Sequence, residues 1–341
     1  MRWLLKAAVQ KGVSAIPQPE RANYVLQRHV TRSLPVSEAT FRKRFARALR
    51  HFSAFREHAP GRPDGGAVFY EFGTGWGLEI PLAYWCLGVD RQILADVRPN
   101  LRLELVNVTL RRLRALLPEL EEAAGRALRD PERGEVGSVR DLADRFGITY
   151  CAPLDARATG LEAGSVDFVS STNTLEHVPA ADLVPILAEC RRLLRPDGAL
   201  SARIDLRDHY AGFDRRLSPY NFLRFGDRTW RILNSRLHYQ NRLRRPAYLE
   251  AFTAAGLPVV AERAARPRRA DLVALGKMRL APEFRRYALD ELGVRGLALV
   301  AKPAVVRLPD AAQELEDVGR RGGPGVGAGA GTDGGRLGDD R

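Results

Sequence analysis

Cysteine and long hydrophobic runs are both scarce in this 341-residue chain. The three cysteines (Cys86, Cys151 and Cys190) are far apart, with no Cys-x-x-Cys pair, and the histidines do not cluster. This spacing argues against a disulfide framework or a metal site of the zinc kind, and it is typical of a reducing cytoplasm. No run of about 18 uncharged apolar residues occurs, so no transmembrane helix is expected.

A clear secretory signal is also missing. The N-terminal segment is basic and apolar, but Lys6 and Gln10 interrupt its apolar run, which is unfavourable for a signal peptide. We therefore expect a cytoplasmic location. Because Trp3, Leu4 and Leu5 stand next to Lys6, peripheral membrane contact through the N-terminus is a further hypothesis.

The charge of +13 is distributed unevenly along the chain. Residues 1–64 carry 13 basic and 4 acidic side chains, and residues 206–250 carry 10 and 4. Residues 65–205 carry 16 basic and 21 acidic side chains. A mildly acidic centre suits a cationic ligand, whereas basic flanks suit an anionic or membrane-surface partner. Solvated arginine faces that only confer solubility are the alternative.

Apolar runs alternate with helical patterns, which predicts an α/β fold: a Rossmann-like, seven-stranded, mostly parallel sheet with helices on both faces. The runs lack clean alternation, as in strands covered on both faces. Strands are expected near 67–72, 92–97, 148–152, 166–171, 199–205, 257–262 and 296–302.

Three regions organise the chain around this sheet. Residues 1–64 are expected to form a helical extension, since Ser37 is a good N-cap ahead of apolar residues at helical spacing up to about Phe55. The central domain is predicted over 65–305, with helical insertions at 98–146 and 206–250. The Gly-rich stretch 318–341 has no apolar pattern and is expected to be disordered.

The segment VFYEFGTGWG, from Val68 to Gly77, carries the main motif. An apolar strand containing Glu71 leads into glycines at positions 73, 75 and 77. Glycine tolerates positive φ and has no side chain, so such a turn lets the backbone approach a ligand closely.

Two common ligand motifs do not fit this turn. The dinucleotide fingerprint Gly-x-Gly-x-x-Gly needs a glycine where Leu78 stands. The phosphate-binding P-loop needs a Gly-Lys-Ser/Thr sequence, and no lysine is near. An ordinary tight strand-to-helix turn remains the alternative.

Acidic residues follow the next two predicted strands. Asp96 ends the second strand, where a carboxylate can accept hydrogen bonds from both hydroxyls of a ribose. Asp155 follows the third strand, where a carboxylate can accept a hydrogen bond from the exocyclic amine of adenine. Further on come Leu175-Glu176-His177-Val178 and the turn sequence 193–200.

This ordered set resembles the class I S-adenosylmethionine-dependent methyltransferases of the methyltransferase-domain-11 kind. The resemblance covers residues 68–205 well and extends loosely to about 303. One departure is Asp197, which stands at a turn position where the family has glycine. Residues 71–76 and 239–244 also look like a group of uncharacterised bacterial methyltransferases.

The resemblance implies S-adenosyl-L-methionine as the cofactor and no metal. The cofactor-binding residues that it implies are Glu71, Gly73, Thr74, Gly75, Gly77, Asp96, Asp155, Ala156 and Asn173.

A catalytic base is expected near the carboxyl edge of the sheet. His177 is the first candidate, with a structural role in its loop as the alternative. Asp205 and His209 belong to a second cluster, with Asp208 and Tyr210, for which a capped turn is the alternative. Arginines and aromatics in 206–250 are a candidate clamp for an anionic group, although half or more of the aromatics are expected in the core.

The predicted function is methyl transfer to an O or N atom of a small-molecule, glycan or lipid-linked acceptor, with an anionic acceptor as one option. An RNA methyltransferase is an alternative, but nucleic acid is not the favoured partner because no RNA-binding module is recognisable. A catalytically inactive binding protein with the same fold is the other alternative.

Overall fold

The computed structural model describes residues 2–14, 19–30, 32–131, 134–214, 216–236 and 239–304 of the chain. The tail predicted at 318–341 lies outside the described residues. Within them, no helix combines the length and apolar character needed to cross a membrane.

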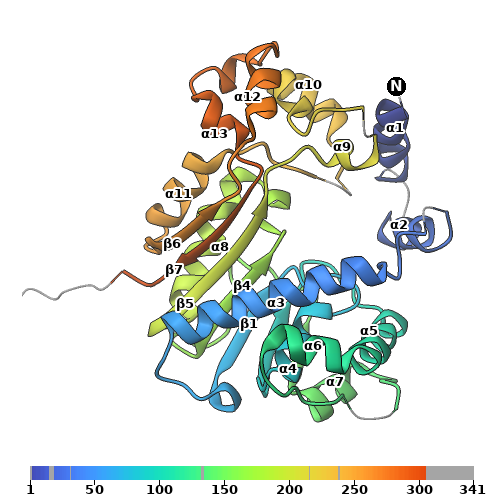
Figure 1. Ribbon diagram of the computed structural model, residues 1–341, viewed down its shortest axis with the longest axis vertical. Helices are drawn as coiled ribbons and strands as arrows, with labels where there is room; N and C mark the ends of the chain where they lie inside the picture. The colour runs from blue at the N-terminus through green and yellow to red at the C-terminus, as the bar shows by residue number, and fades with distance from the viewer. Residues whose placement is uncertain are drawn as a thin grey trace, which may run out of the picture. The chain divides into compact units, whose positions relative to one another are not determined.

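Seven strands form one sheet (Figure 1), in the order β3-β2-β1-β4-β5-β7-β6. The strands are β1 (Val68–Phe72), β2 (Arg91–Ala95), β3 (Ile148–Cys151), β4 (Val166–Thr172), β5 (Leu194–Asp205), β6 (Val259–Ala264) and β7 (Gly296–Ala301). Strands β1 to β5 pair in parallel, whereas β7 runs antiparallel to both β5 and β6. The expected Rossmann-like, mostly parallel sheet is confirmed.

The largest difference from the predicted strands is the start of β5. Leu194 already pairs with Val166, and a register shift follows before Phe168 pairs with Ala199. The turn sequence that predicted a later start is therefore part of the strand's irregular beginning. The extra pairing depends on β4 and was not visible in the local sequence.

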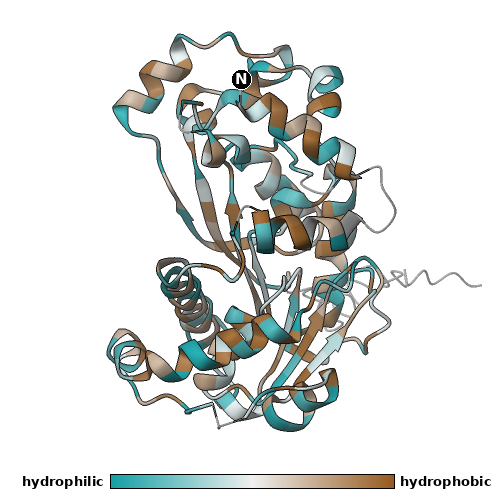
Figure 2. Cartoon of the chain, turned by 90° about the vertical axis from the view of Figure 1, so that its right-hand side faces the viewer, coloured by the Kyte–Doolittle hydropathy of each residue, from teal (hydrophilic) through white to brown (hydrophobic). Residues whose placement is uncertain are grey.

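Helices cover the sheet and extend beyond it, and the helices nearest the viewer in Figure 2 combine hydrophobic and hydrophilic residues. They are α1 (Arg2–Ser14), α2 (Pro19–Val25), α3 (Glu38–His58), α4 (Glu79–Cys86), α5 (Leu103–Ala115), α6 (Leu117–Ala124), α7 (Val139–Phe146), α8 (Ala180–Leu193), α9 (His209–Phe213), α10 (Asp227–Leu233), α11 (Arg245–Ala254), α12 (Arg269–Gly276) and α13 (Leu289–Gly293).

Helix α3 begins where the sequence predicts. The Ser37 hydroxyl accepts a hydrogen bond from the Thr40 backbone N–H at 3.3 Å, which satisfies a free donor of the first turn. Phe45 and Phe55 are buried in a core that also contains residues of α4, α5 and α7. A second core on the opposite face of the sheet contains residues of α8 and α11, so both faces are covered.

A third hydrophobic cluster joins α1, the 206–250 insertion and the α12–α13 region. Trp3 is buried there and contacts Tyr210 and Phe225, with ring centroids 5.6 and 5.8 Å apart. Leu4 and Leu5 remain exposed. Trp3 is therefore a packing residue, and the hypothesis of membrane contact now depends on Leu4 and Leu5.

The order of the strands defines where ligands bind in such a sheet. The chain moves from β1 to β2 on one side, and β4 lies against β1 on the other. Between the carboxyl ends of β1 and β4 the strand order reverses, and open α/β sheets bind their ligands in the crevice formed there.

Candidate functional site

The glycine turn after β1 stands at this crevice. Gly73 has φ +75° and Gly75 has φ +79°, a region that glycine enters readily. A Cβ on Gly73 would lie 2.4 Å from Thr174 Cγ2, whereas a Cβ on Gly75 would meet no heavy atom within 4 Å. Gly73 therefore allows close packing, and Gly75 leaves open space above the backbone.

Gly77 and Leu78 complete the turn, but here the positive φ belongs to Leu78 and not to the glycine. The Gly77 carbonyl accepts a hydrogen bond from the Thr109 hydroxyl at 2.8 Å. It is Leu78, fully buried, that adopts a positive φ of +52°. A bulky residue in this conformation is unusual and costs free energy, as is common at functional sites.

Asp96 lies directly beyond β2, beside the glycine turn. Its Oδ2 accepts hydrogen bonds from the Thr74 hydroxyl at 3.1 Å and the Tyr150 hydroxyl at 3.2 Å. Burial raises the pKa of Asp96 to about 6, and the two hydroxyls oppose this rise. Thr74 and Tyr150 thus fix the carboxylate in one orientation.

Two adjoining cavities open around Asp96, of about 220 and 420 Å³. Both are lined by Gly73, Asp96 and His177. Asp155 and Ala156 line the smaller cavity, and Gly75 and Asn173 line the larger one. Six of the nine predicted cofactor-binding residues thus surround one crevice; Glu71, Thr74 and Gly77 are outside its walls.

Glu71 is buried in β1 behind the glycine turn. Its Oε2 accepts a hydrogen bond from the Ser170 hydroxyl at 3.2 Å. Burial raises the pKa of Glu71 to about 8, and the negative charge of Asp96 adds to the rise. A cation in the crevice would favour the ionised form of this carboxyl group.

Asp155 is exposed at the rim of the smaller cavity. Arg157 Nη2 lies 2.7 Å from Asp155 Oδ2, and Arg157 Nη1 lies 2.8 Å from Asp182 Oδ1. The hydrogen bonds from Arg157 lower the pKa of Asp155. Asp155 is thus ionised, and Arg157 already donates hydrogen bonds to it. A carboxylate has further lone pairs that can accept a hydrogen bond from a ligand.

Asn173 follows β4 with a positive φ of +54°. Its backbone N–H donates to the Arg203 carbonyl at 2.7 Å. Its side-chain Oδ1 is buried and has no hydrogen-bond partner in the described part of the chain. Unsatisfied buried polar atoms are rare in native proteins, and Asn173 is also one of the residues that line the larger cavity.

His177 ends a short helical turn, η3 (Leu175–His177), and borders both cavities. Its Nδ1 lies 2.6 Å from the Tyr239 carbonyl. The carbonyl can only accept, so Nδ1 carries the proton and Nε2 is left as a proton acceptor. Desolvation by the surrounding protein lowers the pKa of His177, which keeps the imidazole neutral.

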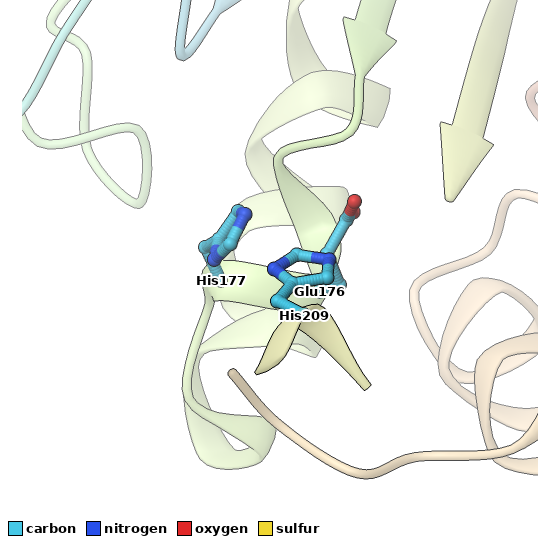
Figure 3. A group of neighbouring side chains, drawn as sticks. All are labelled: Glu176, His177 and His209. Carbon is cyan, nitrogen blue, oxygen red and sulfur yellow. The ribbon is translucent and has the colours of Figure 1, made fainter. Parts of the chain in front are cut away.

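His209, the first residue of α9, lies beside His177 (Figure 3), with ring centroids 5.0 Å apart. Glu176, His177 and His209 each present one ligand atom within 4.8 Å of the others, which makes this trio a group that could hold a metal ion among the described residues. The sequence predicted no metal. His209 is not part of the wall of either cavity.

Asp205 ends β5 and is bound by a neighbouring arginine. Arg207 donates through Nε at 2.9 Å and through Nη2 at 2.6 Å. Arg207 lowers the pKa of Asp205 even though burial opposes this, which makes Asp205 a weak base. The alternative of a capped turn applies to Asp208, which accepts from the Tyr210 backbone N–H at 2.8 Å.

The clamp of arginines and aromatics in 206–250 stays a prediction, and several of its members are packing residues, as expected for half or more of the aromatics. Tyr220, Phe222 and Trp230 are buried in the third cluster. Arg244 is fully buried and donates to the carbonyls of Leu206, Leu292 and Val294. These side chains hold the subdomain together, because buried backbone carbonyls need donors. Tyr239 and Arg236 do line the larger cavity.

The N-terminal region contributes residues that the sequence did not reveal. Gln27 lines the larger cavity. Tyr24 stacks on Trp76 of the glycine turn, with ring centroids 5.3 Å apart. The Arg102 guanidinium lies 5.2 Å from the Tyr24 ring and 5.4 Å from the Trp76 ring. These contacts join residues far apart in sequence, so no local pattern signals them.

Comparison with known proteins identifies part of this framework. Residues 129–202, which include β3, β4 and α8, match the methyltransferase-domain family Methyltransf_11. This confirms the expected resemblance; the bacterial group stays a prediction. A search of curated proteins found no match.

Solved structures with a similar fold include three with different chemistry. The 1,6-didemethyltoxoflavin-N1-methyltransferase of Burkholderia thailandensis, solved with 1,6-didemethyltoxoflavin and S-adenosylhomocysteine, is 16% identical (TM-score 0.42; 83% of this chain and 87% of that chain covered). A geranyl diphosphate methyltransferase is 14% identical (TM-score 0.40; 75% and 78%). The cyclase SpnF is 14% identical (TM-score 0.40; 75% and 82%). Similarity this low carries no argument about substrate.

Proposed function

We propose that this chain, whose residues 129–202 match the methyltransferase-domain family, is an S-adenosylmethionine-dependent methyltransferase. The observation that carries the proposal is the crevice at the carboxyl ends of β1 and β2, where an open glycine turn faces the buried Asp96 carboxylate. The proposed acceptor is an O or N atom of a small molecule, a glycan or a lipid-linked group.

The residues of the crevice fit the chemistry of this cofactor. Asp96 offers a fixed acceptor to ribose hydroxyls, and Asn173 lines the larger cavity together with it. Gly75 leaves space for the methionine part beside the backbone. When bound, S-adenosylmethionine supplies an activated methyl group on a positively charged sulfur. A nearby cation lowers the raised pKa values of Asp96 and Glu71, because it stabilises the ionised carboxylates. Both groups therefore favour a positively charged ligand.

His177 is the proposed general base. Its Nδ1–H is held by the Tyr239 carbonyl, so Nε2 has the lone pair that accepts a proton from an acceptor hydroxyl or amine. A lowered pKa keeps this lone pair free at neutral pH. A positioned base typically contributes about 10²–10⁴-fold to such reactions. Asp205 and His209 are the proposed second group of catalytic residues. Fewer observations support them than support His177, because neither residue lines the crevice.

The larger cavity supports a small acceptor. Its volume of about 420 Å³ lies within the range of small-molecule sites. Arg98 and Arg236 line it, and arginine binds carboxylates and phosphates well, so we include anionic acceptors in the proposal. Peripheral membrane contact through Leu4 and Leu5 and binding of nucleic acid stay predictions, the second not favoured.

Isothermal titration calorimetry with S-adenosylmethionine tests the proposal. We expect micromolar binding to the wild type and none to Gly75→Arg, whose side chain would occupy the open space at the turn. Asp96→Ala should also lose binding. Asp144→Ala, at an exposed position on α7, is the control and should bind normally. Unchanged binding by both crevice variants would refute the site.

A further inference from the structure

A separate cavity of about 300 Å³ lies between α3 and the strands β5, β7 and β6. It shares no lining residue with the crevice. Arg47, Arg50, Arg203 and Arg263 all line it, together with His51. We call it the arginine groove.

The register of the sheet explains why two of these arginines meet. Arg203 of β5 pairs with Ala298 of β7, and Ala298 pairs in turn with Arg263 of β6. Residues directly opposite in paired strands share a face, so both arginines project on the α3 side of the sheet. The small Ala298 between them leaves the floor of the groove open.

Helix α3 supplies the facing wall. Arg47, Arg50 and Ala54 are spaced by three and four residues and thus lie on one side of the helix. His51 fastens this wall to the sheet: its Nδ1 lies 2.8 Å from the Ser201 hydroxyl and its Nε2 lies 3.1 Å from the Thr172 hydroxyl. The groove is therefore built from rigid elements.

The arginines of the groove differ from the other arginines of α3 in their ion pairing. Other arginines of α3 each reach a carboxylate, at 2.6 Å for Arg42, 2.7 Å for Arg44 and 2.8 Å for Arg56. Among the described residues, none of the four guanidinium groups of the groove has an ion-pair partner or a side-chain hydrogen bond to a carboxylate. The contrast within one helix shows that the imbalance is local.

Two acids also border the groove, and both have other contacts. Glu262 is held by Arg245, whose Nη2 donates to Glu262 Oε2 at 2.8 Å. Glu57 lies 3.7 Å from His58 Nε2. Neither neutralises the four arginines.

The crowding of positive charge is unfavourable in the free protein. Burial, with repulsion from Arg203 and Arg44, lowers the pKa of Arg47 to about 10, although the negative charge of Asp205 opposes this shift. Burial and the charges of Arg203, Arg50 and Arg47 lower the pKa of His51 to about 3. An anion between the arginines would relieve this repulsion.

We propose that the arginine groove binds a phosphate or pyrophosphate group. Planar guanidinium groups from two sides pair with phosphate oxygens through two parallel hydrogen bonds each. Convergent arginines are a common solution for binding phosphate groups. No residue of the groove lines the crevice, so this site is separate from the proposed site of methyl transfer.

Titration of the full chain with inorganic pyrophosphate at low salt tests the proposal. The Arg50→Gln/Arg263→Gln variant should bind on the order of tenfold more weakly or worse, since each arginine supplies charge-assisted hydrogen bonds. Arg91→Gln, at an exposed position on β2 outside the groove, is the matched control and should bind as the wild type does. Equal affinity of all three proteins, or no binding by the wild type, would overturn the proposal.

Thermal unfolding gives a second readout that a merely structural role would not produce. Without pyrophosphate, the double variant should unfold at a higher temperature than the wild type, because two repelling charges are gone. With pyrophosphate, the wild type should gain stability and the variant should not. An equal gain in both proteins would also overturn the site.

Vesicles distinguish the source of the phosphate. If the ligand is a lipid headgroup, vesicles containing phosphatidic acid should retain the wild type but not the double variant, and pyrophosphate should compete. If it is a soluble phosphate, the pyrophosphate result stands without vesicle binding. Equal vesicle binding by the wild type and the double variant, without competition by pyrophosphate, would count against the groove as the binding site.

Discussion

The ionisation of two buried carboxyl groups, Asp96 and Glu71, controls the affinity of the crevice for a cationic ligand. Both have raised pKa values, about 6 for Asp96 and about 8 for Glu71, and burial is the main cause in each case. A cationic ligand binds best when both are ionised. Proton release from these groups is therefore coupled to binding.

Affinity for S-adenosylmethionine should rise with pH between about 5 and 8. The free crevice holds protons below these pKa values, and a cation must displace them; above about 8 they are already gone and the affinity should level off. The rise is at most about tenfold per pH unit for each proton released. Calorimetry across this range, in two buffers of different ionisation enthalpy, measures it.

Asp96→Asn is the control for this pH dependence. It cannot ionise, so its affinity should be weaker and should change less between pH 5 and 7 than that of the wild type. The comparison removes the titration of the ligand's own amino group. Equal pH profiles for the two proteins would contradict the role of Asp96.

The sequence predicted the residues of the crevice better than their partners. The order of glycine turn and acids pointed to Asp96 and Asp155, and both line one cavity with Gly73. It gave no sign that Asp155 pairs with Arg157 or that Arg244 is spent on buried carbonyls. Such pairings depend on side-chain geometry in the folded state.

At the scale of elements, α3 joins the hydrophobic core to the arginine groove. Phe55 is fully buried, and its ring centroid lies 4.8 Å from that of Phe69 in β1 and 5.6 Å from that of Phe168 in β4. One turn earlier, His51 makes polar contacts with β4 and β5. The periodicity predicted the apolar face of this helix, but not its arginine-rich side as a cavity wall.

Phe55→Ala should destabilise the fold by about 3–5 kcal/mol, because it removes a buried ring and leaves a cavity beneath α3. Denaturant unfolding followed by circular dichroism measures this. Lys43→Ala, at an exposed position of the same helix, should change the free energy of unfolding by less than about 0.5 kcal/mol. A Phe55 variant as stable as the Lys43 variant would show that α3 is not anchored as described.

The strands were predicted well because buried parallel strands have distinctive apolar runs. Their order in the sheet was a different matter. The antiparallel placement of β7 between β5 and β6 brings Arg203 and Arg263 to one face. Nothing in either segment alone indicates that neighbourhood, so the arginine groove needed the structure.

At the scale of the molecule, polarity changes along the sheet face beneath α3. Phe69 pairs with Phe168, and Phe168 pairs with Ala199, which gives an apolar row. Two residues further along the strands, Glu71 pairs with Ser170. The hydrophobic core thus gives way to polar groups toward the carboxyl edge, where the crevice lies.

The helical cluster around Trp3 is the part that sequence reasoning predicted least well. Residues of α1, the 206–250 insertion and the α12–α13 region share one core. The aromatics of the insertion were expected partly as ligands of an anion, and they are mostly packing residues. Their partners lie more than 200 residues away from Trp3 in some cases, as with Leu292, and local patterns do not reveal such contacts.

The crystal structure of the complex with S-adenosylhomocysteine tests the central claim most directly. The account predicts the ribose hydroxyls on the Asp96 carboxylate, the amino acid part beside Gly73 and Gly75, and the sulfur facing the larger cavity near His177. A ligand bound elsewhere, or within the crevice without contact to Asp96 and the glycine turn, would contradict it.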